Sequence, residues 1–138
     1  MSGTVRSAAV TGLAFLAASC VKPGHIEQNR PEHTMSFTGS YEFMTSCVQN
    51  RLGAKVQEQP DRTVVYGAAK SRQVDGFTHY AITLRRTGPG EGIAMLRVQR
   101  VLTHGTSTTA IAPPKLSEAA LYEYWFPVEE CARRAKGE

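Results

Sequence analysis

The sequence lacks the short motifs that mark the common catalytic and cofactor-binding sites. It contains no Cys-x-x-Cys pair, no His-Glu-x-x-His, no Walker loop and no Gly-x-Ser-x-Gly. The glycine-rich stretch at 88–92 joins two predicted strands, and no helix follows it that could hold a phosphate at its N-terminus. We therefore expect no catalytic residue, no cofactor and no metal site.

Strong charge and long apolar runs are also missing. Lys and Arg number 16 against 12 Asp and Glu, which gives a formal net charge of +4. The basic residues are not clustered enough to indicate a nucleic-acid interface, and no apolar run reaches the roughly 20 residues that span a bilayer. We expect no nucleic-acid partner, and the roughly 120 residues after an N-terminal leader are enough for one domain with one core.

The first 20 residues have the three parts of an export signal. Arg6 precedes an apolar run from Ala8 to Ala18, and small residues then lead to Cys20. This ending resembles the lipobox of bacterial lipoproteins, with Ala17 at a position where leucine is commoner. The resemblance covers these 20 residues only and names no family for the rest of the chain.

For this chain, the resemblance implies a signal peptide at residues 1–19 and lipidation of Cys20, which becomes the first residue of the mature protein. Neither Val21 nor Lys22 is the aspartate that marks such lipoproteins for retention in the inner membrane. The resemblance therefore implies an anchor in the outer membrane, facing the periplasm. The membrane is then one partner, through the lipid. Cleavage without lipidation, which gives a soluble periplasmic or secreted protein, is the alternative.

The other two cysteines, Cys47 and Cys131, make an even pair in an oxidising compartment, where a disulfide is expected. On the chain-entropy model, a bridge that closes a loop of about 84 residues stabilises the fold by roughly 4–5 kcal/mol. A free buried thiol and a thiolate nucleophile are the alternatives.

Residues 20–38 are predicted to be a flexible tether, because two prolines, a glycine and mixed charges leave no helical or strand period. Histidines and glutamates lie in this stretch, but a tether offers no scaffold for a metal site. A helix is predicted at 40–53, where Ser40 can cap the start, Gly53 can end the helix, and one apolar face contains Cys47.

A β-hairpin is predicted at 77–103, because both arms alternate apolar and polar residues. Pairing about a loop centred on Pro89 sets Tyr80, Ile82 and Leu84 against Val98, Leu96 and Ala94, and a slip of one residue would split this apolar face. The opposite face is polar and is either half covered or an exposed binding face. It contains the candidate binding residues, which are His79, Arg85, Arg97 and Gln99.

A second helix is predicted at 116–134, with Cys131 on its apolar stripe and either a kink or a new helix start at Pro127. Residues 39–138 are therefore predicted to form a small α+β domain. Its parts are an N-terminal helix, a three- to four-stranded antiparallel meander and a kinked C-terminal helix. Both helices are expected on one sheet face, joined by Cys47–Cys131.

These features favour a non-enzymatic cell-envelope lipoprotein that binds another protein or an envelope polymer through its sheet face or loops. An inhibitor or immunity-type protein that blocks one enzyme is a narrower form of this hypothesis. A small hydrolase that uses His104, Asp75 and Ser107 is the alternative from another class, because a Ser-His-Asp set could meet if the strands curl.

Overall fold

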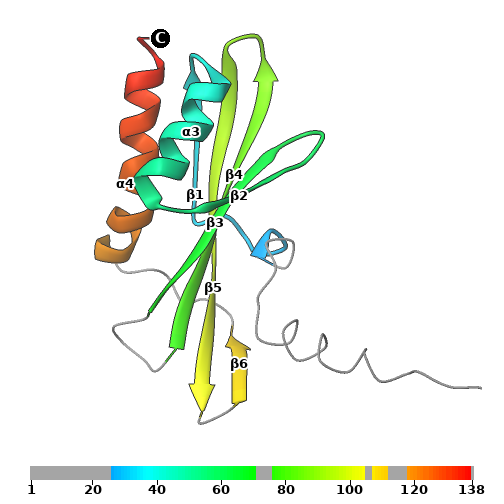
Figure 1. The fold of residues 1–138 in the computed structure, drawn as a ribbon, viewed down its shortest axis with the longest axis vertical. Helices are drawn as coiled ribbons and strands as arrows, with labels where there is room; N and C mark the ends of the chain where they lie inside the picture. The colour runs from blue at the N-terminus through cyan, green and yellow to red at the C-terminus, as the bar shows by residue number, and fades with distance from the viewer. Residues whose placement is uncertain (1–25, 71–75, 105–106, 112–117, 138) are drawn as a thin grey trace, which may run out of the picture.

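The computed structural model of the chain describes residues 26–70, 76–104, 107–111 and 118–137. The predicted signal peptide, Cys20 and Asp75 lie outside the described residues. The described part is an α+β fold that combines an antiparallel sheet with two helices, so the predicted fold class is confirmed (Figure 1).

The sheet has six strands in the described part of the chain, in the order β1-β5-β4-β3-β2, and β6 pairs with β5 beyond the end of β1. The predicted meander corresponds to β2–β5, and three to four strands is too few because the prediction omits β1 and β6. The elements are β1 (His33–Thr38), α3 (Tyr41–Leu52), β2 (Lys55–Glu58), β3 (Thr63–Lys70), β4 (Gly76–Gly88), β5 (Glu91–His104), β6 (Ser107–Ile111) and α4 (Glu118–Ala135).

Helix α3 has both of the caps that its sequence predicts. The Ser40 side chain accepts a hydrogen bond from the backbone N–H of Phe43 at 3.1 Å, which satisfies one of the unpaired donors of the first turn. Gly53 ends the helix in the left-handed conformation, at φ 61°, where glycine carries no steric penalty. Met44 and Val48 on its apolar face are fully buried.

The long hairpin of β4 and β5 has the predicted register. Tyr80 lies opposite Val98, Ile82 opposite Leu96 and Leu84 opposite Ala94, and all six side chains are buried. The turn is tighter than the predicted loop, because only Pro89 and Gly90 separate the strands. Gly90 has φ 66°, which explains the glycine there.

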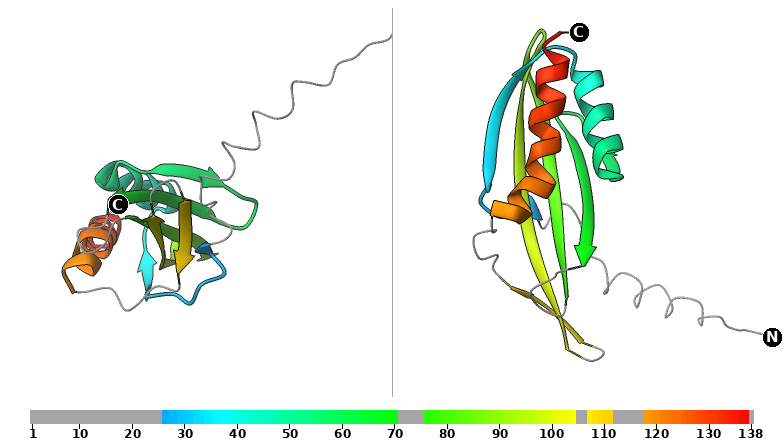
Figure 2. Two further views of the ribbon diagram at one scale, coloured as in Figure 1. Left: turned by 90° about the horizontal axis from the view of Figure 1, so that it is seen from below. Right: turned by 90° about the vertical axis from the view of Figure 1, so that its left-hand side faces the viewer.

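Both helices pack on one face of the sheet, which we call the helix face, as predicted (Figure 2). Cys47 of α3 and Cys131 of α4 form the predicted disulfide, with their Cα atoms 5.8 Å apart. Helix α4 runs through Pro127 as a single element, so no new helix begins after Phe126. The fully buried core under the helices includes Met44, Val48, Val65, Ile82, Leu84, Ala94, Leu96, Val128 and Cys131.

The predicted tether is wrong over its C-terminal part. Residues 33–38 form β1, which pairs with β5 along its whole length, and Ile26 is only 1% exposed. Met35 and Phe37 alternate with polar residues, as a strand requires, and Ile26 packs in an apolar site on the sheet. The fold therefore begins at least thirteen residues before the predicted boundary at residue 39, because the described chain is part of the fold from Ile26 on.

Candidate functional site

The four predicted binding residues lie on the sheet face opposite the helices, which we call the outer face. Side chains alternate between the two faces of a strand, and the buried helix-face residues Tyr80, Ile82 and Leu84 fix which side chains of β4 point outward. His79 pairs with Gln99 across β4 and β5, as predicted. Arg85 lies six residues further along β4, and Arg97 lies two residues from Gln99 on β5.

The outer face is partly covered by residues 26–32, which we call the crossing segment. This segment lies on the side of the sheet away from both helices (Figure 1). Ile26 packs against Val64 and Ala81, which form a small apolar cluster separate from the main core, with Tyr66 at its margin. Of the two alternatives for this face, half covered or exposed, the structure therefore shows the first.

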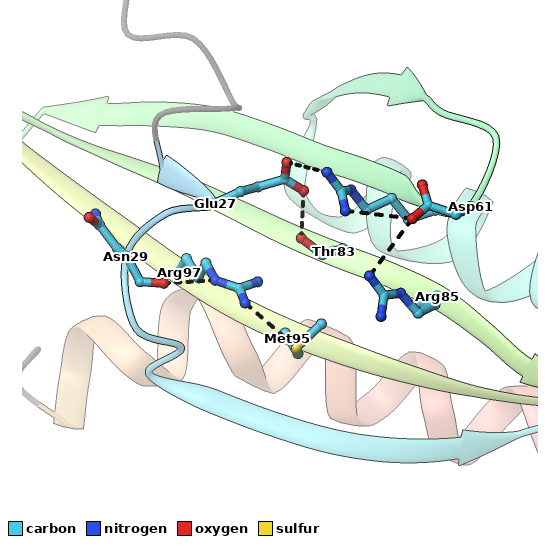
Figure 3. Close-up of polar contacts among 8 residues, drawn as sticks. Glu27, Asn29, Asp61, Thr83, Arg85, Met95 and Arg97 are labelled. Carbon is cyan, nitrogen blue, oxygen red and sulfur yellow. Dashed lines mark hydrogen bonds and ion pairs between the residues drawn. The ribbon is translucent and has the colours of Figure 1, made fainter.

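Glu27 of the crossing segment joins two side chains of the sheet (Figure 3). One carboxylate oxygen accepts a hydrogen bond from Nη2 of Arg62 at 3.1 Å, and the other accepts from the hydroxyl of Thr83 at 3.2 Å. Thr83 is 2% exposed, so this carboxylate supplies a partner for a hydroxyl that water does not reach. A buried polar group without a partner is destabilising.

Asn29 fixes the other end of the crossing segment to β5. Its side-chain amide donates to the carbonyl of Val98 at 2.8 Å and to Oε1 of Gln99 at 3.0 Å. The main-chain carbonyl of Asn29 accepts a hydrogen bond from Nε of Arg97 at 2.9 Å. Val98 lies in the gap between the residues of β5 that pair with β1 and those that pair with β6. The amide thus supplies a donor where neither strand does.

Three guanidinium groups gather on the outer face, and we call Arg62, Arg85 and Arg97 the arginine cluster. Asp61 lies 3.7 Å from Nη1 of Arg62 and 3.8 Å from Nη2 of Arg85, which are long contacts for ion pairs. Arg97 also contacts the sulfur of Met95 at 3.8 Å, and sulfur is a weak acceptor (Figure 3). Three cations therefore share two carboxylates, those of Glu27 and Asp61.

The electrostatics of Arg97 reflect this excess of positive charge. Burial lowers the pKa of its guanidinium below the ordinary value, Glu27 opposes the shift, and repulsion from Arg62 and Arg85 adds to it. The Arg97 group remains charged at neutral pH, because arginine does not lose its proton in proteins. An additional anion beside Arg85 and Arg97 would relieve the repulsion, and Arg85 is 46% exposed and can be reached from solvent.

His79 adds no charge to this face at neutral pH. Burial lowers the pKa of its imidazole below the ordinary 6.5, because a partly desolvated site disfavours the charged form. His79 can still exchange hydrogen bonds, since neutral imidazole has one donor and one acceptor nitrogen. It lies at the end of the outer face away from Arg85, so it is not a member of the arginine cluster.

The residues of the alternative hydrolase hypothesis are only partly described. The backbones of His104 and Ser107 pair across β5 and β6, and Asp75 lies outside the described residues. The hydrolase therefore stays a prediction. Among the described residues there is no group of three or more His, Cys, Asp or Glu side chains placed to hold a metal ion.

Four residues of the site were not predicted from the sequence: Glu27, Asn29, Asp61 and Arg62. Glu27 and Asn29 belong to the stretch predicted as a tether, and Asp61 belongs to a turn. Ile26, the first bulky apolar residue after the leader, was the one signal in this stretch, and it is weak because single apolar residues are also common on protein surfaces. The contact of Glu27 with Arg62, 35 residues away, could not be predicted from that signal.

None of the described helices has the length and apolarity needed to cross a membrane. Comparison with protein-family models, with curated proteins and with solved structures finds no match for this chain.

Proposed function

We propose that this chain is a non-enzymatic binding domain of the cell envelope that recognises an anionic group through the arginine cluster. One observation carries the proposal: three guanidinium groups lie close together with only two carboxylates to neutralise them, and the side chain of Arg85 is exposed to solvent. Guanidinium groups bind carboxylate and phosphate in bidentate geometry. Both groups occur on the proposed partners, which are another protein or an envelope polymer.

The proposed location is the outer membrane, facing the periplasm, with the chain held by lipid on Cys20. The Cys47–Cys131 disulfide agrees with an oxidising compartment. Intact-mass spectrometry of membrane and soluble fractions tests this part. We expect a diacyl or triacyl mass on a chain that begins at Cys20, and an unmodified full-length chain with three free thiols would contradict it.

The anion-binding proposal is tested with two defined probes, inorganic polyphosphate and poly-glutamate. Binding of the full chain is measured by fluorescence anisotropy of the labelled probe at low and at physiological salt. We expect Arg85→Gln and Arg97→Gln each to weaken binding by about tenfold, because each removes a charge-assisted contact. Arg134→Gln, which removes an exposed cation from α4 on the sheet face opposite the arginine cluster, is the matched control.

Two results would contradict the proposal. One is that neither probe binds the full chain, and the other is that Arg134→Gln weakens binding as much as the two cluster variants. The difference between the probes separates phosphate from carboxylate recognition. The inhibitor form of the hypothesis predicts a one-to-one complex with an enzyme that loses its activity, and the hydrolase alternative predicts an activity that His104→Ala abolishes.

A further inference from the structure

The edge strands β1 and β2 differ in how well they are protected against a further strand, and β6 forms a third, separate edge beyond the end of β1. Edge β2 is four residues long and has charged residues at both ends, Lys55 and Glu58, as protected edges do. Edge β1 is six residues long and contains neither lysine, arginine, acid nor proline. Within the described chain β1 pairs with β5 and with no other strand.

The outward main-chain groups of β1 can be assigned from its register. In an antiparallel pair, alternate residues direct their N–H and C=O groups toward the neighbouring strand, and the others direct them away. Gly39 donates to the carbonyl of Gly90 at 2.9 Å in continuation of the β1–β5 register. By alternation, the residues that direct their main-chain groups to the open edge are Thr34, Ser36 and Thr38, whose side chains are exposed.

A groove of about 590 Å³ runs between β1 and helix α4. Its base is apolar, because Met35 and Phe37 of β1 meet Trp125 and Ala132 of α4. The Trp125 ring is 5% exposed and stacks on His33, with ring centroids 5.3 Å apart. The groove thus offers sites for apolar side chains directly beside an open strand edge.

The rim of this groove on α4 has an excess of positive charge. Arg133 and Lys136 are both exposed and line the groove, and Glu129 is the one acidic side chain among its lining residues. The lining residues therefore include two cations against one anion, so the complementary occupant carries negative charge.

We propose that β1 accepts an extended, acidic segment of a partner protein as an additional strand of the sheet. Main-chain hydrogen bonds to Thr34, Ser36 and Thr38 supply affinity, and alternate apolar side chains enter the groove beside Trp125. The acidic side chains that contact Arg133 and Lys136 and set specificity point to the same face as these apolar ones, at other alternate positions of the segment. The groove lining includes no member of the arginine cluster, so the test of this proposal is independent of the test of the anion-binding function.

The test uses the full chain with its disulfide formed, labelled with ¹⁵N, and three eight-residue peptides. The first carries Val and Glu in turn at every second position with Thr between them (Thr-Val-Thr-Glu repeated, the Val/Glu peptide), so that the Val and Glu side chains face α4 together. The second has Lys in place of Glu (the Val/Lys peptide), and the third is the Val/Glu peptide with alternate amides N-methylated. We expect only the first to bind strongly, and we expect it to slow hydrogen exchange at the amides of Thr34, Ser36 and Thr38. Loss of binding on N-methylation reports the main-chain contacts.

Charge reversal tests the specificity without relying on a disruptive change in the core. The double variant Arg133→Glu, Lys136→Glu is expected to prefer the Val/Lys peptide by about tenfold. Arg134→Glu, on the same turn of α4 but outside the groove lining, is the matched control and should keep the preference for Val/Glu. Urea unfolding of each variant confirms that the fold is retained.

Three outcomes would overturn the proposal. No peptide binds, or the Val/Glu peptide binds without protecting the three edge amides. In the third, the edge amides become protected as protein concentration rises in the absence of peptide, which would identify a second copy of this chain as the occupant of β1.

Discussion

At the scale of single residues, Glu27 joins a cation and a buried hydroxyl through its two carboxylate oxygens. Its side chain is 12% exposed, and that of Arg62 is 29% exposed, so water screens this pair less than it screens a surface pair. The exposed pair of Glu42 with Arg86 has the same charges and a shorter contact of 2.7 Å. A comparison of substitutions in the two pairs therefore tests whether burial or contact distance determines how much an ion pair contributes to stability.

We expect Glu27→Ala to lower the free energy of unfolding by about 1–3 kcal/mol, because the Thr83 hydroxyl and the Arg62 guanidinium both lose a partner. Glu42→Ala should have a much smaller effect, since exposed ion pairs contribute little. Urea unfolding followed by the fluorescence of Trp125 measures both. Equal effects of the two substitutions would show that Glu27 acts as an ordinary surface charge.

His79 should make the stability of the fold depend on pH. Burial lowers the pKa of the folded imidazole below 6.5, so the unfolded chain binds a proton that the folded chain does not. Stability contributed by the neutral imidazole is therefore complete above the unfolded pKa and is lost as the pH falls below about 6.5. We expect His79→Gln to reduce this loss of stability, measured by urea unfolding at a series of pH values. An unchanged pH dependence in the variant would contradict this.

At the scale of elements, β1 is held against β5 by an aromatic ring that lies over a glycine. Phe37 pairs with Gly92 across the two strands, and a Cβ atom on Gly92 would overlap the Phe37 ring and lie 2.9 Å from the carbonyl oxygen of Arg85. Gly67 and Tyr80 repeat the arrangement between β3 and β4. The absence of a side chain at Gly67 thus leaves room for the ring of Tyr80.

We expect Gly92→Ala to destabilise the fold by about 1–3 kcal/mol, because overpacking displaces the Phe37 ring. The added Phe37→Leu substitution should recover part of this loss, so the double variant costs less than the sum of the single changes. Gly88→Ala is the control, since its Cβ would meet only the flexible carboxylate of Glu91, at 3.3 Å. Additive effects at residues 37 and 92 would argue against direct packing between them.

The sequence allowed prediction of those elements whose signals are local and dense. Helix α3 has a cap residue at each end, and the β4–β5 hairpin has three apolar residues on each arm, so its register was determined. Strand β1 has only Met35 and Phe37 as apolar residues on its helix face. Two apolar residues are too weak a pattern beside neighbouring prolines and charges, and pairing with residues 53 or more positions away decided the structure.

The candidate site was predictable only in part for the same reason. Alternation placed His79, Arg85, Arg97 and Gln99 on one face, and the structure agrees. That Arg97 and Gln99 contact Asn29 depends on the path of the crossing segment, which nothing in its composition specifies. The residues of the binding face were therefore predicted, but the crossing segment that covers part of this face was not.

At the scale of the whole molecule, the disulfide links the two helices that cover the sheet. Cys47 and Cys131 are 84 residues apart in sequence, and strands β2–β6 lie between them. The ion pair between Arg51 and Glu130 joins the same two helices near the bridge. Long loops lose the most chain entropy when they are closed in the unfolded state, so a bridge at this separation has a large effect on stability.

Reduction of the bridge is expected to lower the free energy of unfolding by about 2–5 kcal/mol. The double variant Cys47→Ser, Cys131→Ser should match the reduced protein in urea unfolding, and Cys20→Ser should match the oxidised one. Alkylation followed by mass spectrometry confirms the state of each thiol. If the double variant Cys47→Ser, Cys131→Ser were as stable as the oxidised protein, the bridge would make no contribution to stability beyond the packing of the helices.

The crossing segment also limits how far the fold can lie from a membrane. If Cys20 is the lipidated residue, only six peptide steps separate it from Ile26, which is fixed in the apolar cluster of the outer face. A fully extended chain of that length reaches on the order of 20 Å, about a third of what a tether through residue 38 would allow. An anchored molecule would thus be confined to the layer next to the lipid head groups and could meet only partners that enter it.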